Sequence, residues 1–553
     1  MKKGILRIIA TILCFTVLFS GTAIGVSATE AVTNEENIMD DIGDGIVKGF
    51  YELLNDIVET LVKAICLIYP NPVSWEDISE YDSEEVGFMP GRDVYQSGAA
   101  SSNVWSLGYS SASLVPDDID SGKYNLGRDL MNKYAEGVYD DMRIRVTAID
   151  DGSGEGLAVF GAVDALGVTS TDVRAIRKAV LAYFEGLGIE ISSINICATH
   201  SHSALDTQGV STEFFKKLFL GSFCNLFGLS VPGLEYPEAF KEHFINVAID
   251  TVIAAVNDME QGKLYYETID CSSIIKDKRG LIDKEDIPET AVLYFSPFSG
   301  TEDTYIADIS CHPTSFSASN GLVSSDYIYH LDNYIKAQTG ANFLMVPGAI
   351  GQLSREIEVD ETGLTEWEAK GAAAKTLGEA FGALILAGDY TNELAPVLNV
   401  RHREIFVAPE NSILTLACEI NLVNNRIYTE GVVFKDAYMA TEIGYIEFGN
   451  EVAFALFPAE LYPEVFWDDE ITDGTTWDGT EWPYDSLAES VDGVDVFCVS
   501  LANDAMGYVL TDNNFAFMGH IIGEEIADEV LSVGKHTGSF IVNEYYALIG
   551  DLK

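Results

Sequence analysis

Positive charge is scarce in this sequence. It contains 32 Lys and Arg against 87 Asp and Glu, which gives a formal net charge of −55. Binding to nucleic acid or to an anionic membrane surface draws on clustered Lys and Arg, so both kinds of partner are disfavoured. Proline is also scarce, with 15 residues in 553, whereas 47% of the residues are hydrophobic. The chain therefore has enough apolar material for a large core and is not a disordered acidic tail.

Cysteine is present without the spacing of a structural site. The eight cysteines occupy positions 14, 66, 197, 224, 271, 311, 418 and 498, and no Cys-x-x-Cys pair occurs. Removal of Cys14 with the N-terminal segment described next leaves an odd number. Wide spacing and an odd count argue against a disulfide framework and against a cysteine-based zinc site. We expect most of these side chains to be buried small hydrophobic groups.

Long hydrophobic runs are confined to the N-terminus. Lys2, Lys3 and Arg7 precede an apolar stretch over 8–26, and Val26-Ser27-Ala28 follows. This pattern predicts a signal peptide, residues 1–28, and therefore a secreted or cell-surface protein. An uncleaved N-terminal anchor is the alternative, because the stretch is almost long enough to span a bilayer.

The rest of the chain divides into an extension and a main domain. Residues 29–103 are expected to form an acidic linker with an amphipathic helix over 46–68, which either packs on the main body or acts as a lid. Residues 104–553 alternate strand and helix patterns. This predicts an α/β fold with a large mixed or parallel sheet and helices on both faces. The predicted strands are 157–163, 193–199, 304–311, 342–347, 452–457 and 494–501; the predicted helices are 171–185, 325–338 and 368–388.

Chemically active residues follow several predicted strands. They are His200 and His202, His312, Ser354 in the Gly-rich turn 348–354, Glu460, and Tyr508. In open α/β sheets, ligands bind outside the carboxyl ends of strands, where loops from separate strands meet. We therefore expect these side chains to surround one crevice.

The histidines and the glutamate indicate a metal. A single His-x-His pair is more often structural, but adding His312 and Glu460 at equivalent positions favours a site. Neutral imidazoles with one carboxylate suit a hydrolytic zinc ion that activates water. A lone serine in a turn is usually a helix cap, and the turn carrying Ser354 matches neither the Gly-x-Ser-x-Gly elbow nor a phosphate loop.

These motifs resemble those of the neutral/alkaline (non-lysosomal) ceramidase family, amidases that cleave ceramide to sphingosine and a fatty acid. The similarity runs from about residue 108 to residue 544 and lies in an ordered set of segments. These are Ala198-Thr199-His200-Ser201-His202-Ser203, similar to the family's THTHSGP; Cys311-His312-Pro313-Thr314; the turn at 348–354, similar to GDVSP; Phe457-Pro458-Ala459-Glu460, similar to PGE; and Asn503 to Tyr508, an Asn-x-x-x-x-Tyr pattern.

The resemblance implies a role for each residue. His200, His312, Glu460 and Tyr508 correspond to the zinc ligands. Ser354 corresponds to the proposed catalytic serine, and His202 to the histidine beside the reacting centre. The implied substrate contacts are Arg279, Gly351 and Asp164.

The resemblance also predicts a function. We expect a secreted zinc-dependent amidase acting on ceramide or a related lipid amide, with transient contact to a neutral lipid surface. The apolar segment 214–229 is expected to be either a core helix or the wall of an acyl-chain pocket. Because only 45 residues follow Tyr508, we expect no C-terminal immunoglobulin-like domain.

The sequence departs from the family pattern at Gln352 and Arg355, and at Ala204 and Leu205. The first pair bears on the role of the serine, and the second pair bears on substrate contacts. Two alternatives therefore stay open. One is a zinc hydrolase of another N-acyl amide or ester, and the other is an extracellular binding protein with a relict site.

Overall fold

The computed structural model describes ten segments of the chain. These are residues 75–127, 133–209, 238–316, 321–411, 414–415, 418, 425–429, 437–468, 476–515 and 528–550. The predicted signal peptide, the 46–68 helix and the apolar segment 214–229 lie outside them. No helix within the described segments is long and apolar enough to cross a bilayer.

The larger sheet has nine strands in the order β12-β10-β9-β7-β2-β4-β5-β6, with β14 paired to β7. Only the β5·β6 and β10·β12 pairs are parallel among the described pairings of this sheet. The strands are β2 Trp105–Ser113, β4 Arg143–Asp150, β5 Leu157–Val163, β6 Ile191–Ala198, β7 Glu260–Ile269, β9 Thr290–Pro297, β10 Thr304–Ile309, β12 Asn342–Pro347 and β14 Asn392–Glu393.

A second sheet has six strands in the order β1-β16-β17-β18-β20, with β15 paired to β17. Its members are β1 Trp75–Asp77, β15 Leu398–Val407, β16 Ile427–Thr429, β17 Ala437–Phe448, β18 Val452–Leu456 and β20 Asp495–Val499. Short strands form three further pairs: β3 Gly137–Val138 with β11 Leu322–Val323, β8 Ile275–Asp277 with β13 Leu353–Arg355, and β19 Glu460–Leu461 with β21 Tyr508–Val509.

The two sheets pack face to face. Phe160 of the larger sheet packs against both Phe448 and Phe454 of the smaller one, at ring-centroid distances of 6.0 and 6.1 Å. These rings belong to a core cluster that draws side chains from both sheets. Burying large aromatic side chains is the main favourable contribution to such a contact.

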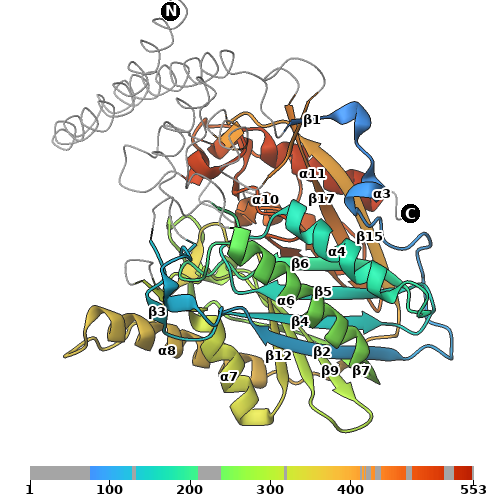
Figure 1. Cartoon of the computed structure of the whole chain (residues 1–553), viewed down its shortest axis with the longest axis horizontal. Helices are drawn as coiled ribbons and strands as arrows, with labels where there is room; N and C mark the ends of the chain where they lie inside the picture. Colours follow the sequence, from blue (N-terminus) through green and yellow to red (C-terminus); the bar gives the residue numbers. More distant parts are fainter. Residues whose placement is uncertain are drawn as a thin grey trace, which may run out of the picture.

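Helices cover the outer face of each sheet (Figure 1). On the larger sheet, α6 (Glu238–Asn257) packs on β2 and β4 beside α4 (Ser170–Phe184), while α7 (Tyr327–Thr339) packs on β12 beside α8 (Glu366–Leu386). On the smaller sheet, α11 (Thr537–Gly550) packs on β15 and β17. The short helices are α3 Ser83–Val86, α10 Pro463–Trp467, η1 Ile78–Glu80, η2 Ile119–Ser121, η3 Lys284–Asp286, η6 Leu487–Glu489, η7 Asp512–Asn514 and η8 Asp528–Leu531.

Local sequence explains where several helices begin and end. Thr365 and Glu368 form a reciprocal capping box at the start of α8, which satisfies two backbone N–H groups that lack helical partners. The α7 helix ends at Gly340, whose φ of 80° is readily adopted only by glycine.

The structure confirms the prediction of a mixed α/β fold. The bounds of β5 and β12 are those predicted. The inner face of the larger sheet, however, is covered by the second sheet rather than by helices, and antiparallel pairs predominate. A strand buried on both faces shows a continuous apolar run whether a helix or another sheet covers it. The sequence pattern therefore does not distinguish a face covered by helices from a face covered by a second sheet.

The five cysteines in the described segments behave as expected. Cys197, Cys271, Cys311, Cys418 and Cys498 are free and buried. Burial raises the pKa of Cys197 to about 12 and that of Cys271 to about 11. These thiols therefore act as small core side chains.

Candidate metal centre

The predicted ligands meet at one end of both sheets. His200 follows β6 and His312 follows β10, both in the larger sheet. Glu460 begins β19 after β18 of the smaller sheet, and it pairs in parallel register with Tyr508 of β21. The site therefore depends on the packing of one sheet against the other.

The donor atoms converge closely. His200 Nε2 lies 3.0 Å from Glu460 Oε2, and His312 Nε2 lies 3.8 Å from the same oxygen. His202 Nε2 lies 3.2 Å from His312 Nε2. The three histidines form a group with ligand atoms within 4.8 Å of one another, which can hold a metal ion.

Backbone carbonyls orient two of the imidazoles. His200 Nδ1 lies 2.6 Å from the Leu166 carbonyl oxygen, and His312 Nδ1 lies 3.0 Å from that of Ile350. Because a carbonyl oxygen only accepts, each Nδ1 must carry the proton, and each Nε2 turns its lone pair inward. This is the usual arrangement of metal-binding histidines.

The site fits a small divalent cation. His200 Nε2 and Glu460 Oε2 are buried and have no hydrogen-bond partner among the described residues, which is costly unless another group satisfies them. Tetrahedral zinc with bonds of about 2.0–2.1 Å holds its ligand atoms about 3.4 Å apart. The separations of 3.0 and 3.8 Å bracket that value.

The electrostatics favour neutral ring ligands. Burial, followed by the charges of Lys278, His200 and His202, holds the pKa of His312 well below its usual value. Burial and the negative charge of Glu460 raise the pKa of Tyr508 well above its usual value. A neutral imidazole is the form that binds a metal.

Strained backbone positions the two ligand-bearing loops. His200 has a φ of 67° and Asn503 has a φ of 64°, in the left-handed region that non-glycine residues rarely adopt. The Asn503 side-chain oxygen accepts from the Ile196 N–H at 3.0 Å, and the Asn503 backbone N–H donates to the Ile196 carbonyl at 2.8 Å. These bonds join the loop that leads to Tyr508 to the strand that leads to His200.

Gly507, which immediately precedes Tyr508, is required by its surroundings. Its φ is 88°, and a Cβ atom there would lie 1.7 Å from the carbonyl oxygen of Leu531. Any side chain at this position must displace the backbone beside the phenol.

The Gly-rich turn lies between the histidine and glutamate strands. Its Gly351 N–H donates to the Leu461 carbonyl at 2.9 Å, and its Leu353 carbonyl accepts from the His312 N–H at 2.9 Å. Ser354 is buried in β13, opposite Lys276 of β8. The turn thus binds the backbone of His312 and of Leu461, which follows Glu460. The catalytic role of Ser354 stays a prediction.

Arg279 lies beside this turn. Its guanidinium donates to Gln352 Oε1 at 3.3 Å and lies 3.7 Å from a carboxylate oxygen of Glu464. It also lies over the Tyr462 ring, 5.2 Å from the ring centroid. Its predicted contact with substrate remains untested.

Asp164 belongs to the framework around the site. Its carboxylate accepts two hydrogen bonds from Arg145, at 2.8 and 3.0 Å, and both side chains are fully buried. It also accepts from the Arg143 N–H and from the Ser325 hydroxyl. These contacts support a structural role, and substrate contact by Asp164 stays a prediction.

Two acidic residues near the site were missed by sequence reasoning. Burial raises the pKa of Asp528 to about 6 and that of Asp140 to about 7. The Tyr462 hydroxyl donates to Asp528, and Asp140 accepts from Ser324 behind the histidine loop. Neither residue carries a sequence signal beyond being one of 87 acids.

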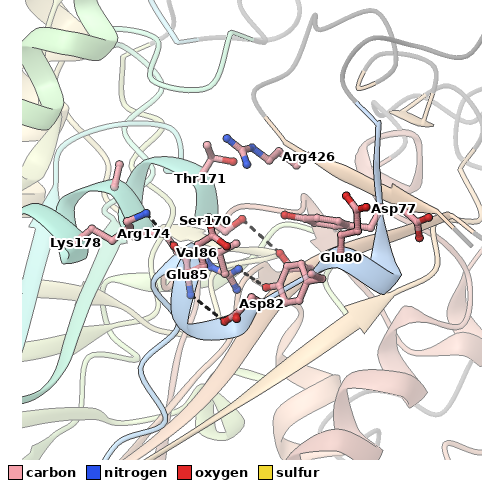
Figure 2. A pocket seen from close by; sticks show the side chains of 14 residues that line it. Asp77, Glu80, Asp82, Glu85, Val86, Ser170, Thr171, Arg174, Lys178 and Arg426 are labelled. Atoms are coloured by element: carbon pink, nitrogen blue, oxygen red, sulfur yellow. Dashed lines mark hydrogen bonds between the residues drawn. The ribbon is translucent and has the colours of Figure 1, made fainter.

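A polar cavity of about 700 Å³ lies elsewhere, between α4, the segment that carries η1 and α3, and strands β16 and β17 (Figure 2). Arg174 and Lys178 of α4 line it together with acidic residues such as Glu80 and Glu85. None of the described residues that line it is a predicted site residue.

Comparisons with known proteins give the fold. No protein-family model and no curated protein matches the sequence. The structure is similar to that of neutral ceramidase from Pseudomonas aeruginosa, with a TM-score of 0.59 and 14% identity over 81% of this chain and 74% of that chain. It is also similar to a ceramidase complexed with C2, with a TM-score of 0.58 and 14% identity over 81% of this chain and 75% of that chain. At this identity the likeness concerns the fold, so the chain has a ceramidase-like fold around a buried histidine group that can hold a metal ion.

Proposed function

We propose that the chain is a zinc-dependent amidase that hydrolyses the N-acyl bond of ceramide or a related lipid amide. The observation that carries this proposal is the convergence of His200, His312 and Glu460. Two of the inward-facing atoms, His200 Nε2 and Glu460 Oε2, have no hydrogen-bond partner among the described residues. The ceramidase-like fold and the order of the sequence motifs support the same reaction class.

The proposed zinc ligands are His200, His312, Glu460 and Tyr508. Zinc bound there would polarise the amide carbonyl and lower the pKa of a bound water to about 7. The two carbonyl-anchored imidazoles and the buried carboxylate hold the donor atoms at fixed separations, so little reorganisation is needed on binding.

The remaining site residues handle the proton and the substrate. His202 is half-buried beside His312, where its imidazole accepts or relays a proton. Ser354 either attacks as a nucleophile or holds the water or the developing oxyanion. Arg279, Gly351 and Asp164 are the proposed substrate contacts.

Export completes the proposal. The signal peptide predicted over 1–28 would deliver the enzyme to the medium or the cell surface. The net charge of −55 favours neutral over anionic lipid surfaces.

The test is metal analysis of the purified protein together with an acyl-release assay. We expect stoichiometric zinc and release of fatty acid from a short-chain ceramide, and His200→Ala should lose both. His330→Ala is the control, because His330 lies on α7, outside the histidine group. Full activity in a zinc-free His200→Ala variant would refute the metal mechanism.

The same assay separates the alternatives. Activity on a soluble N-acyl amino acid or an ester, without activity on ceramide, would assign another substrate class. A protein that binds ceramide but holds no zinc and hydrolyses none of these substrates would indicate a relict site.

A further inference from the structure

The turn that carries His202 is joined to a distant segment by hydrogen bonds on both sides of the histidine. The Ser201 hydroxyl donates to the Ser324 carbonyl at 2.8 Å, and the Ser324 N–H donates to the Ser203 carbonyl at 2.9 Å. The Ser203 hydroxyl donates to the Leu322 carbonyl at 3.1 Å. The backbone on either side of His202 is therefore held by residues 322–324.

That segment is itself held by one carboxylate. Asp140 accepts from the Ser324 hydroxyl at 2.7 Å and from the Ser325 N–H at 2.7 Å. Its own N–H donates to the Val323 carbonyl at 3.3 Å. Asp140 is 6% exposed, so water contributes little to these bonds.

Keeping a carboxylate at this position opposes folding. Burial raises the pKa of Asp140 to about 7, although the hydrogen bonds from Ser324 and Ser325 lower it. The charges of Asp326 and Asp164 raise it further. Asp140 therefore contributes to this segment through the two hydrogen bonds that its oxygens accept rather than through its charge.

The other two histidines of the group are oriented independently. His200 and His312 each hold a hydrogen bond to a backbone carbonyl, from Leu166 and from Ile350 respectively. His202 is carried by the backbone that Ser201 and Ser203 tie to residues 322–324. Loosening that segment should therefore displace the backbone that carries His202, whereas the His200 and His312 rings keep their carbonyl contacts.

We infer that Asp140 is a positioning residue for His202: it fixes Ser324 and Ser325, which fix the turn that places the His202 ring beside His312. This inference rests on the proposed function, in which His202 transfers a proton during amide hydrolysis. It assigns to Asp140 no contact with substrate or metal.

The test is a double-mutant cycle on the full-length purified protein, measured with a short-chain ceramide. Asp140→Ala should lower kcat by about 100-fold, the size expected when a catalytic group is misplaced by about 1 Å. KM and zinc content should change little. Because Asp140 acts through His202, the Asp140→Ala/His202→Ala variant should be no slower than His202→Ala alone.

Conservative variants separate positioning from folding. Asp140→Asn keeps an oxygen acceptor for the Ser325 N–H and should retain most of the rate. Ser324→Ala removes one of the two hydrogen bonds that Asp140 accepts from this segment and keeps the carboxylate, so it tests the link even if Asp140→Ala does not fold. Asp141→Asn is the matched control, because the neighbouring Asp141 carboxylate pairs with Arg143 and Ser113 instead.

A second readout does not depend on hydrolysis. With eight histidines in the chain, selective isotope labelling resolves their ring signals, and His202→Ala identifies that of His202. Asp140→Ala or Ser324→Ala should move the His202 ring signals and leave those of the remote His402 unchanged.

The outcomes are distinguishable. Additive losses in the cycle, or unmoved His202 signals, would overturn the positioning role. A wild-type protein that hydrolyses no amide, yet shows the His202 shift in Asp140→Ala, would refute the proposed function and support the positioning role.

Discussion

Glu460→Gln offers the sharpest test of the metal centre, because it changes one atom of the side chain and little of its shape. Glu460 Oε2 lies 3.0 and 3.8 Å from the Nε2 atoms of His200 and His312, and it is buried without a hydrogen-bond partner among the described residues. A neutral amide oxygen is a poorer zinc ligand than a carboxylate, so zinc affinity should fall.

The expected size follows from linkage. Zinc at about 1,000 times its Kd stabilises the native state by about 4 kcal/mol. A chain of 553 residues has an unfolding entropy of about 1 kcal/mol/K, so zinc should raise Tm by about 4 °C. If Glu460→Gln weakens zinc binding by about 100-fold, the stabilisation falls to about 1.4 kcal/mol and the Tm shift to about 1.4 °C.

The assay is differential scanning of each protein with zinc and after stripping with a chelator. Comparing the two states of one variant removes any effect of the substitution on the metal-free protein. Glu464→Gln is the control, because this buried carboxylate lies beside Arg279, and its zinc-dependent Tm shift should match that of wild type. An equal shift in wild type and Glu460→Gln would refute the assignment of Glu460 as a ligand.

Three further predictions concern stability. Burial lowers the pKa of His402 from 6.5 to about 4, so as the pH falls the unfolded chain binds a proton before the folded chain does. The free energy of unfolding should therefore fall by about 3 kcal/mol between pH 6.5 and 4. Urea unfolding at several pH values should show a smaller fall for His402→Gln. Gly507→Ala should lower both Tm and zinc content, because the added Cβ meets a backbone carbonyl. Gly363 has a similar positive φ but open space around it, so Gly363→Ala should cost about 1–2 kcal/mol of stability and leave zinc content unchanged. Arg177→Ala should cost about 3–5 kcal/mol in the same unfolding assay, because it leaves the buried Glu442 carboxylate without the two hydrogen bonds it accepts at 2.5 and 2.7 Å.

Sequence periodicity found one kind of strand and missed another. The predicted strands became the parallel pairs β5·β6, β10·β12 and β18·β20. Strands such as β2 and β7 were missed because they mix buried with more exposed residues and include a glycine, and β7 also carries charged side chains. A continuous apolar run is the signal of a strand covered on both faces, and these strands lack it.

The approximate location of the site was also readable from sequence. The pattern alone places His200, His312 and Glu460 at strand ends. In the structure, the Nε2 atoms of both histidines lie within 3.8 Å of Glu460 Oε2. The acceptors that orient the rings were not predictable, because the Leu166 and Ile350 carbonyls belong to the backbone and carry no sequence signature. Asp140 was missed for a related reason: its partners lie 184 and 185 residues away in the chain.

The sequence by itself therefore determined the mixed α/β class and the residue types at the strand ends, since burial periodicity and side-chain chemistry are local properties. Only the tertiary structure decided that two sheets stack face to face, and that this contact sets Glu460 of one against His200 and His312 of the other. Distances between groups so far apart in the chain depend on packing of the whole core, for which no short stretch of sequence carries the information.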